Sequence, residues 1–298
     1  MSWLSLVLIS VNFSAVSGIF DKFFCSKKFK NVLSYLVLGN LLQLPFLISL
    51  LFFVKHSIPL GWPLLFALLS GPLFFAMWFL YFKALVSAEA SRVGAIFNVT
   101  LIFNLILATL LLGERLTNVK ILAIILIFIG ATICSYEKEK LKKEKFNPAY
   151  LLVILSALIA SIGNILTKAA VETVSPLSTY LLSYSAGLPI FLGLLLKKPI
   201  RNEIKEHLLS NKNVGLIFFN KTLSFFSVCL YYLALAKGPV SLIGAVSNGV
   251  YPLLMFIYTT ISSLFFPHII KERIEKEVIF LKLLAIVLIV GGVVIISL

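Results

Sequence analysis

The chain has 298 residues, of which 60% are hydrophobic and 13% are charged, and its formal net charge is +14. Soluble proteins contain about 45–50% apolar and about 25% charged residues, so this chain has too little polar surface to fold as a globule in water. The cations lie in short connections between apolar runs. This pattern indicates contact with lipid headgroups rather than binding of nucleic acid.

Ten apolar segments are each long enough to cross a bilayer as a helix, which requires about 20 residues. Apolar residues run through them without strict alternation, so the sequence predicts helices rather than a closed β-barrel. The predicted spans are residues 2–22, 32–54, 62–85, 90–113, 117–136, 148–170, 175–197, 213–236, 239–266 and 277–298. We therefore expect an all-α integral membrane protein with ten transmembrane helices.

The third and fourth predicted helices closely resemble the eighth and ninth. Residues 81–98 and 231–248 align without a gap at a constant offset of 150 positions. Identical Tyr, Ser, Gly and Asn in one register indicate an internal duplication, because chance matches in an apolar chain are mostly Leu and Ala. The identical pairs are Tyr81/Tyr231, Ala84/Ala234, Leu85/Leu235, Ser91/Ser241, Gly94/Gly244, Ala95/Ala245 and Asn98/Asn248.

The duplication divides the whole chain into two halves of five helices. Residues 18–22 near the end of the first helix match residues 164–168 near the end of the sixth. We predict a first repeat at residues 1–136, a charged linker at 137–147 and a second repeat at 148–298. Because each repeat has an odd number of helices, the second enters the membrane from the opposite side and the repeats are inverted. Transporters use this symmetry, with the substrate site near the midplane between the repeats.

Three short motifs follow one another in the chain, and two of them occur in both halves. They are Tyr-x-x-Ala-Leu at 81–85 and 231–235, Leu-Leu-Gly-Glu-Arg at 111–115, and Leu-Ile-x-x-Gly at 126–130 and 288–292. With these motifs the whole chain resembles the drug/metabolite transporter superfamily, EamA type. The resemblance implies movement of small organic molecules, often export of metabolites or amino acids, through a central cavity between the halves.

The chain departs from the family pattern at two places. The fourth helix lacks a proline near residues 100–102, whereas the ninth helix contains Pro252. The second copy of Gly-Glu-Arg is reduced to Lys-Glu-Arg at residues 271–273. These departures lead us to expect a first half that gates less flexibly than the second.

Residues that could carry catalysis or bind a metal are scattered. His56, His207 and His268 are isolated, and all twelve carboxylates lie near helix ends or in connections. The three cysteines are far apart in apolar surroundings, which favours buried thiols over disulfides. The sequence therefore predicts no catalytic residue, no metal site and no cofactor.

Lys221 lies about two turns inside the predicted eighth helix, where a charge is costly and usually faces a cavity or a partner. Either Lys221 contacts an anionic substrate group, or the helix starts nearer Asn220 and Lys221 snorkels to the headgroups. Asp21 and Glu89 could carry protons, but both lie close to predicted interfaces, where snorkelling and capping are alternatives. The middle of the first helix holds Asn12 and no acidic residue. This disfavours the glutamate mechanism of small multidrug exporters.

The other candidate cavity residues are uncharged, and each has a structural alternative. Asn98 and Asn248 could bind substrate on either side of a pseudo-two-fold axis or hydrogen-bond neighbouring helices together. The aromatic candidates could line the cavity or mark the membrane interface. Ser14 and Asn164 belong to small polar faces that also suit close helix packing. The complete set of candidate substrate-binding residues is Asn12, Ser14, Trp78, Tyr81, Asn98, Asn164, Lys221, Tyr231, Tyr232 and Asn248.

These observations predict a multi-pass protein of the cell membrane that exports a small polar or amphipathic metabolite, such as an amino acid, by alternating access. A carrier of lipid-linked or phosphorylated sugars is the alternative if Lys221 faces the cavity. A membrane protein with a structural or assembly role is an alternative from another class. The expected partners are a small-molecule substrate and the lipid bilayer, without nucleic acid, and the sequence leaves monomer and homodimer open.

Overall fold

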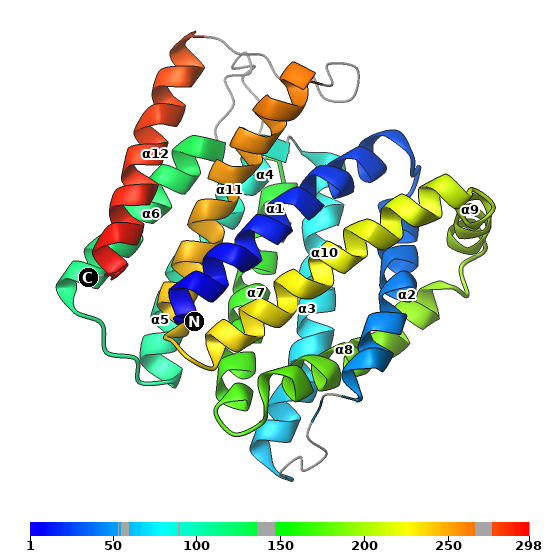
Figure 1. Ribbon diagram of the computed structural model, residues 1–298, viewed down its shortest axis with the longest axis horizontal. Helices are drawn as coiled ribbons and strands as arrows, with labels where there is room; N and C mark the ends of the chain where they lie inside the picture. Colours follow the sequence, from blue (N-terminus) through cyan, green and yellow to red (C-terminus); the bar gives the residue numbers. More distant parts are fainter. Residues whose placement is uncertain (53, 55–59, 89, 136–146, 266–275, 298) are drawn as a thin grey trace.

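The computed structural model describes residues 1–52, 54, 60–88, 90–135, 147–265 and 276–297, and Figure 1 labels the helices in these ranges. Every regular element in this part of the chain is a helix. Nine helices in the same ranges are long and apolar enough to cross a membrane, and Leu281–Ser297 forms a shorter apolar helix. An all-helical membrane protein is therefore confirmed, while the total of ten spans stays a prediction.

The helices follow the predicted segments closely, apart from differences of a few residues at their ends. In the first half they are α1 (Trp3–Lys27), α2 (Val32–Leu50), α3 (Trp62–Ser87), α4 (Ala90–Phe97), α5 (Thr100–Leu111) and α6 (Asn118–Ser135). In the second half they are α7 (Ala149–Val171), α8 (Pro176–Leu194), α9 (Lys198–Leu208), α10 (Asn211–Leu235), α11 (Val240–Phe265) and α12 (Lys276–Ser297). Two features lie outside the predicted pattern, namely the interruption between α4 and α5 and the additional helix α9.

The predicted span 90–113 is interrupted at Asn98 and Val99, which form a turn between α4 and α5. The Leu101 amide donates to the Asn98 carbonyl over 2.9 Å, so the chain tightens to a bond between residues three apart. The Thr100 hydroxyl donates to a carbonyl of the preceding turn, 2.6 Å away. The corresponding helix α11 is continuous although it contains Pro252. The interrupted helix is therefore the one without an internal proline. The presence of a proline alone does not decide which of the two helices is broken.

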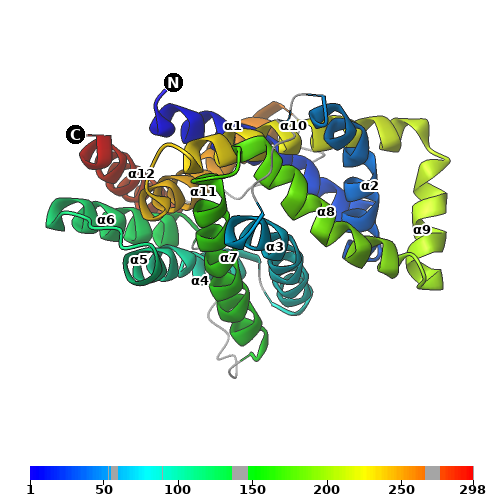
Figure 2. The same ribbon diagram turned by 90° about the horizontal axis from the view of Figure 1, so that it is seen from below.

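Part of the basic connection between the seventh and eighth predicted spans forms the amphipathic helix α9, which stands at one end of the molecule in Figure 2. Its apolar face is buried through Ile200 and Ile204. Glu203 Oε1 accepts hydrogen bonds from the backbone amides of Lys30 (2.5 Å) and Asn31 (3.3 Å). Helix α9 therefore holds the connection between α1 and α2 in place.

The two halves make equivalent helix contacts. Helix α1 packs against α10 and α11, and α7 packs against α3, α4 and α5 (Figures 1 and 2). Because α7 is the repeat counterpart of α1, α3 of α10, and α4 with α5 of α11, each set of contacts corresponds to the other. At the residue level, Ser17 contacts Ser224, and their counterparts Gly163 and Phe74 also lie against each other. The packing therefore agrees with a two-repeat architecture.

The main apolar core lies where the two halves meet. It joins Leu101 and Ile127 of the first half with Leu242 and Val246 of the second, and all four side chains are buried. Many large apolar side chains remain exposed on the outer surface instead, including that of Leu110. This distribution is expected in a bilayer, where lipid tails replace water around the protein.

Candidate functional site

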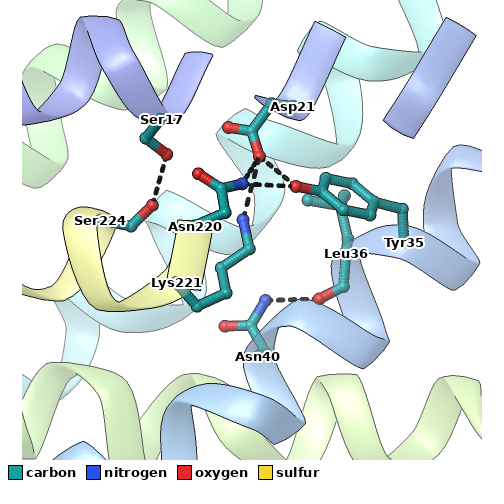
Figure 3. Close-up of polar contacts among 8 residues, drawn as sticks. All are labelled: Ser17, Asp21, Tyr35, Leu36, Asn40, Asn220, Lys221 and Ser224. Carbon is teal, nitrogen blue, oxygen red and sulfur yellow. Dashed lines mark hydrogen bonds and ion pairs between the residues drawn. The ribbon is translucent and has the colours of Figure 1, made fainter. Parts of the chain in front are cut away.

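Four polar side chains from three helices meet within segments predicted to span the membrane (Figure 3). Lys221 and Asn220 belong to α10, Asp21 to α1 and Tyr35 to α2. Lys221 Nζ lies 3.2 Å from Asp21 Oδ1, and Asn220 Nδ2 donates to the same oxygen over 2.7 Å. The Tyr35 hydroxyl also donates to Asp21 Oδ1, and it accepts from Asn220 Nδ2 over 2.7 Å. We call these four residues the charge cluster.

The charged members of the cluster lie inside their helices, whereas Tyr35 belongs to the first turn of α2. At a rise of 1.5 Å per residue, Lys221 is about 15 Å from the start of α10 and Asp21 about 9 Å from the end of α1. The Lys221 side chain is 12% exposed, and its Nζ lies 4.9 Å from the centre of the Tyr35 ring. The Lys221 side chain is therefore largely buried, and a carboxylate of the chain itself compensates its charge. No local pattern marks this pair, because its members lie 200 positions apart.

The Lys221 side chain fits because α2 presents Gly39 to it. A Cβ atom on Gly39 would lie 2.5 Å from Lys221 Cε. In the other half, the counterpart of Lys221 is Gly71, and a Cβ atom there would overlap the backbone carbonyl of Ser183 in α8. A proline inside both α2 and α8 aligns these two helices and makes Ser183 the counterpart of Gly39. The contact of α2 with α10 therefore encloses a lysine side chain. The equivalent contact of α8 with α3 brings the two backbones close together.

A row of serines continues the contact between α1 and α10 beyond the charge cluster. The Ser17 and Ser224 hydroxyl oxygens lie 2.7 Å apart, and those of Ser14 and Ser227 lie 2.6 Å apart. The Ser10 hydroxyl donates to the Ser227 carbonyl over 2.8 Å. Ser14, a candidate cavity residue, therefore joins two helices here. We call these five residues the serine seam.

The structure distributes the candidate asparagines over several helices. Asn12 is exposed and accepts a hydrogen bond from a tyrosine of α11 over 2.6 Å. Asn98 is buried and donates to a serine of α6 over 3.4 Å, and Asn248 is half-buried in α11. Asn164 donates to the fully buried Asn104 over 3.4 Å. The sequence does not single out Asn104, because it has no identical counterpart in the other repeat. Its contact with Asn164 in the structure identifies it as a further candidate.

The candidate aromatic residues do not form one wall in the structure. Trp78 is 46% exposed, whereas Tyr81 packs into a small cluster that α3 forms with α4 and α7. Tyr231 and Tyr232 belong to α10 and pack with the main core, where Tyr232 is buried. Tyr81 therefore lies in a different apolar cluster from Tyr231 and Tyr232.

Two charged side chains bind helix ends, and Glu114 does so across the repeat boundary. Glu114 Oε1 accepts from the Val240 amide over 2.6 Å, and Glu114 Oε2 accepts from the amide and the hydroxyl of Ser241. Because α11 begins at Val240, the carboxylate of the Gly-Glu-Arg motif caps a helix of the other half. Gly113, with φ of +66°, makes the turn that precedes Glu114. Just before the start of α11, Lys168 of α7 donates to the carbonyl of Leu235, the last residue of α10, over 2.9 Å.

Several sequence predictions fall outside the described residues. These are Glu89, His56, His268, linker residues 137–146, and residues 271–273 with the second copy of the Gly-Glu-Arg motif. Within the ranges that the structure does describe, no group of three or more His, Cys, Asp and Glu side chains is placed to hold a metal ion.

Comparisons with known proteins agree with this architecture. Residues 1–136 and 147–298 match the EamA-like transporter family. One crystal structure, described only as that of a protein, has a TM-score of 0.68 and 15% sequence identity, covering 99% of this chain and 96% of its own. At this identity the likeness concerns the fold alone. No curated protein matches the chain. Since the family match covers both halves of an all-helical, strongly apolar chain, the protein belongs to the EamA-like transporter family and is a multi-pass transporter of the cell membrane.

Proposed function

We propose that the protein exports a small polar or amphipathic metabolite, such as an amino acid, by alternating access between two inverted repeats. The observation that carries this proposal is the equivalence of helix contacts in the two halves, α1 with α10 and α11, and α7 with α3, α4 and α5. Halves that make equivalent contacts can exchange roles, so that the centre opens first to one side and then to the other. The outward direction rests on the family resemblance.

Buried polar side chains near the contact of the halves support a polar substrate. Asn104 and Asn164 face each other between α5 and α7, and the charge cluster joins α1 and α2 to α10. Such groups are costly in an apolar environment unless they bind one another or a solute. Polar groups that a solute could satisfy at this position support transport over a structural or assembly role.

A carrier of phosphorylated or lipid-linked sugars is the second candidate from the sequence. It would use Lys221 as a cationic site for the phosphate. The Asp21 carboxylate at 3.2 Å already neutralises this lysine, so a bound phosphate would add negative charge that no group of the charge cluster compensates. The ion pair therefore favours a polar metabolite over a phosphorylated sugar.

A transport screen with the purified full-length chain in liposomes tests the proposed activity. The panel contains radiolabelled amino acids, amines, sugars and sugar phosphates, each measured with and without a proton gradient. Protein-free liposomes prepared in parallel are the control. Movement of a solute above this control supports the proposal. If no solute moves in either direction, the result favours a structural or assembly role over transport.

A reversible cross-link tests alternating access separately. The Ser17 and Ser224 hydroxyl oxygens lie 2.7 Å apart, so Ser17→Cys/Ser224→Cys places two thiols at the contact of α1 with α10. The background for this variant replaces the native cysteines Cys25, Cys134 and Cys229 by alanine. Oxidation is expected to abolish transport and reduction to restore it, whereas the single variant Ser17→Cys should respond to neither treatment. Undiminished transport by the cross-linked protein would contradict alternating access at this contact.

A further inference from the structure

The charge cluster has features that a structural ion pair does not need. Donors from Tyr35, Asn220 and Lys221 all converge on Asp21 Oδ1. In the described part of the chain no hydrogen bond reaches the second carboxylate oxygen, Oδ2, and the Asp21 side chain is 34% exposed. Stability alone does not explain such a pair, because apolar residues of similar volume often serve a buried position equally well. One acceptor of the cluster is therefore available to a ligand.

A second acceptor beside it also lacks a donor. Asn220 is fully buried and its Nδ2 donates twice, but in the described part of the chain its Oδ1 has no hydrogen-bond partner. In Figure 3 this oxygen and the unbonded oxygen of Asp21 both point toward the side on which Ser17 lies. A buried acceptor without a donor is costly and rare in native proteins. The two oxygens together suit a group with several N–H donors, such as an ammonium.

The charge cluster lies beside helices of both halves. Gly18, one turn before Asp21 in α1, leaves space for the hydroxyl of Tyr251 in α11. Asp21 is therefore close to the contact of α1 with α11, which joins the two halves. A substrate site in an inverted-repeat transporter is expected at the interface between the repeats.

The equivalent place in the other half carries no charge. The counterparts of the Asp, Asn and Lys of the charge cluster are Thr167, Ser70 and Gly71. The repeat architecture therefore does not require a charged group at this position, and the chain has one such cluster rather than two related by the pseudo-symmetry.

We propose that the charge cluster binds the head group of a zwitterionic solute, with the ammonium on Asp21 and Asn220 and the carboxylate on Lys221. This inference rests on the transport function proposed above and adds the group by which the substrate is recognised. The Asp21–Lys221 pair is neutral as a whole. An added amine or an added carboxylate would leave an uncompensated charge at low dielectric constant, whereas a zwitterion adds a charge of each sign and keeps the site neutral.

Binding to the purified full-length chain in detergent tests the inference through the rise in apparent melting temperature with ligand concentration. Three probes are compared: an equimolar mixture of the neutral L-amino acids, the same mixture N-acetylated, and the same mixture as methyl esters. Their head groups carry net charges of about 0, −1 and +1 at neutral pH. The native protein is expected to bind the zwitterions at concentrations at least about thirtyfold lower than either derivative. This factor corresponds to the loss of one partner of a buried charge pair, which costs about 2 kcal/mol or more.

Two single variants are expected to change this preference in opposite directions. Asp21→Asn leaves the lysine uncompensated, so the N-acetylated mixture should become the preferred ligand. Lys221→Gln leaves the carboxylate uncompensated, so the methyl esters should become preferred. Lys168→Gln is the matched control, because the Lys168 side chain is 13% exposed and that of Lys221 12%. It should keep the native preference, whereas a purely structural role predicts no exchange of preference in any variant.

The double variant Asp21→Asn/Lys221→Gln decides the question if a single variant fails to fold. It leaves no unpaired charge, so it should fold and lose the preference for zwitterions. Retention of the preference in this variant, or no stabilisation of the native protein by the amino-acid mixture, would overturn the inference. The transport screen remains independent, since movement of another solute class without amino-acid binding would refute this site and leave the transport function standing.

Discussion

The contact between α3 and α8 predicts that Gly71→Ala destabilises the protein, although alanine is the better helix former. A Cβ atom at position 71 would overlap the backbone carbonyl of Ser183 and lie 3.2 Å from the Gly187 amide nitrogen. Both obstacles are backbone atoms of a helix, so no side chain can rotate away to make room. The two helices would have to move apart along their contact.

Two opposing terms set the size of the effect. Helix propensity alone favours alanine over glycine by about 1 kcal/mol. Forcing a methyl group into a closely packed contact costs about 1–3 kcal/mol, and an overlap with backbone belongs at the upper end of that range. We therefore expect a net loss of about 1–2 kcal/mol. At about 2–4 °C per kcal/mol for a large domain, the apparent Tm should fall by about 2–8 °C.

The assay heats purified protein in detergent and measures the fraction that remains monodisperse by size-exclusion chromatography. Gly215→Ala in α10 is the matched control, because no heavy atom lies within 4 Å of a Cβ atom at that position. This control should raise the apparent Tm, since it gains helix propensity without a collision. If Gly71→Ala raised the apparent Tm as much as Gly215→Ala, the close contact between α3 and α8 would be refuted.

Three further substitutions probe other contacts. Glu114→Gln removes the charge at the start of α11 and should lower stability by about 0.5–1.5 kcal/mol in the same thermal assay. Glu172→Gln is the control and should leave stability unchanged, because the Glu172 side chain is 57% exposed. Ser227→Ala breaks the serine seam and should cost about 1–3 kcal/mol, with faster hydrogen exchange in α1 and α10 as the readout; unchanged exchange would argue against the seam. Ile204→Glu should release α9 and expose its ends to limited proteolysis, and equal cleavage of the exposed control Arg201→Glu would contradict this packing.

The positions of the helices could be predicted because a bilayer demands long apolar segments, and the duplication fixed how those segments divide. The interruption at Asn98 could not be predicted from local sequence. Asn98 and Asn248 are identical repeat counterparts, yet the first lies in a turn and the second in a continuous helix. The residues that follow the two asparagines differ, and Asn98 also contacts a serine of α6. Helix α9 was predictable in principle, since Ile200 and Ile204 have the spacing of one helix face.

The candidate site could be predicted only in part. Lys221 attracts attention because a charge inside a span is costly, but its own neighbourhood in the sequence does not indicate its partner. The pairing with Asp21 depends on α1 and α10 lying antiparallel, with Ser17 opposite Ser224 one turn away. Asp21 is the sole carboxylate of the first predicted span, so a search for one partner across the halves would have selected it. Tyr35 has no such signal, since its role depends on the approach of α2.

If the two repeats open alternately as proposed, the different contacts of Gly71 and Lys221 imply that the two openings are unequal. Opening beside Lys221 exposes hydrogen-bonding groups that water or a solute can satisfy, whereas separating α3 from α8 at Gly71 loses close packing and gains no polar partner. In the cysteine-free background, Ser17→Cys should therefore react faster with a membrane-impermeant thiol reagent than Ser70→Cys, although both serines are buried in this structure. Equal labelling rates, measured on intact protein in liposomes, would mean that both sides open with similar ease and that the charge cluster does not bias the motion.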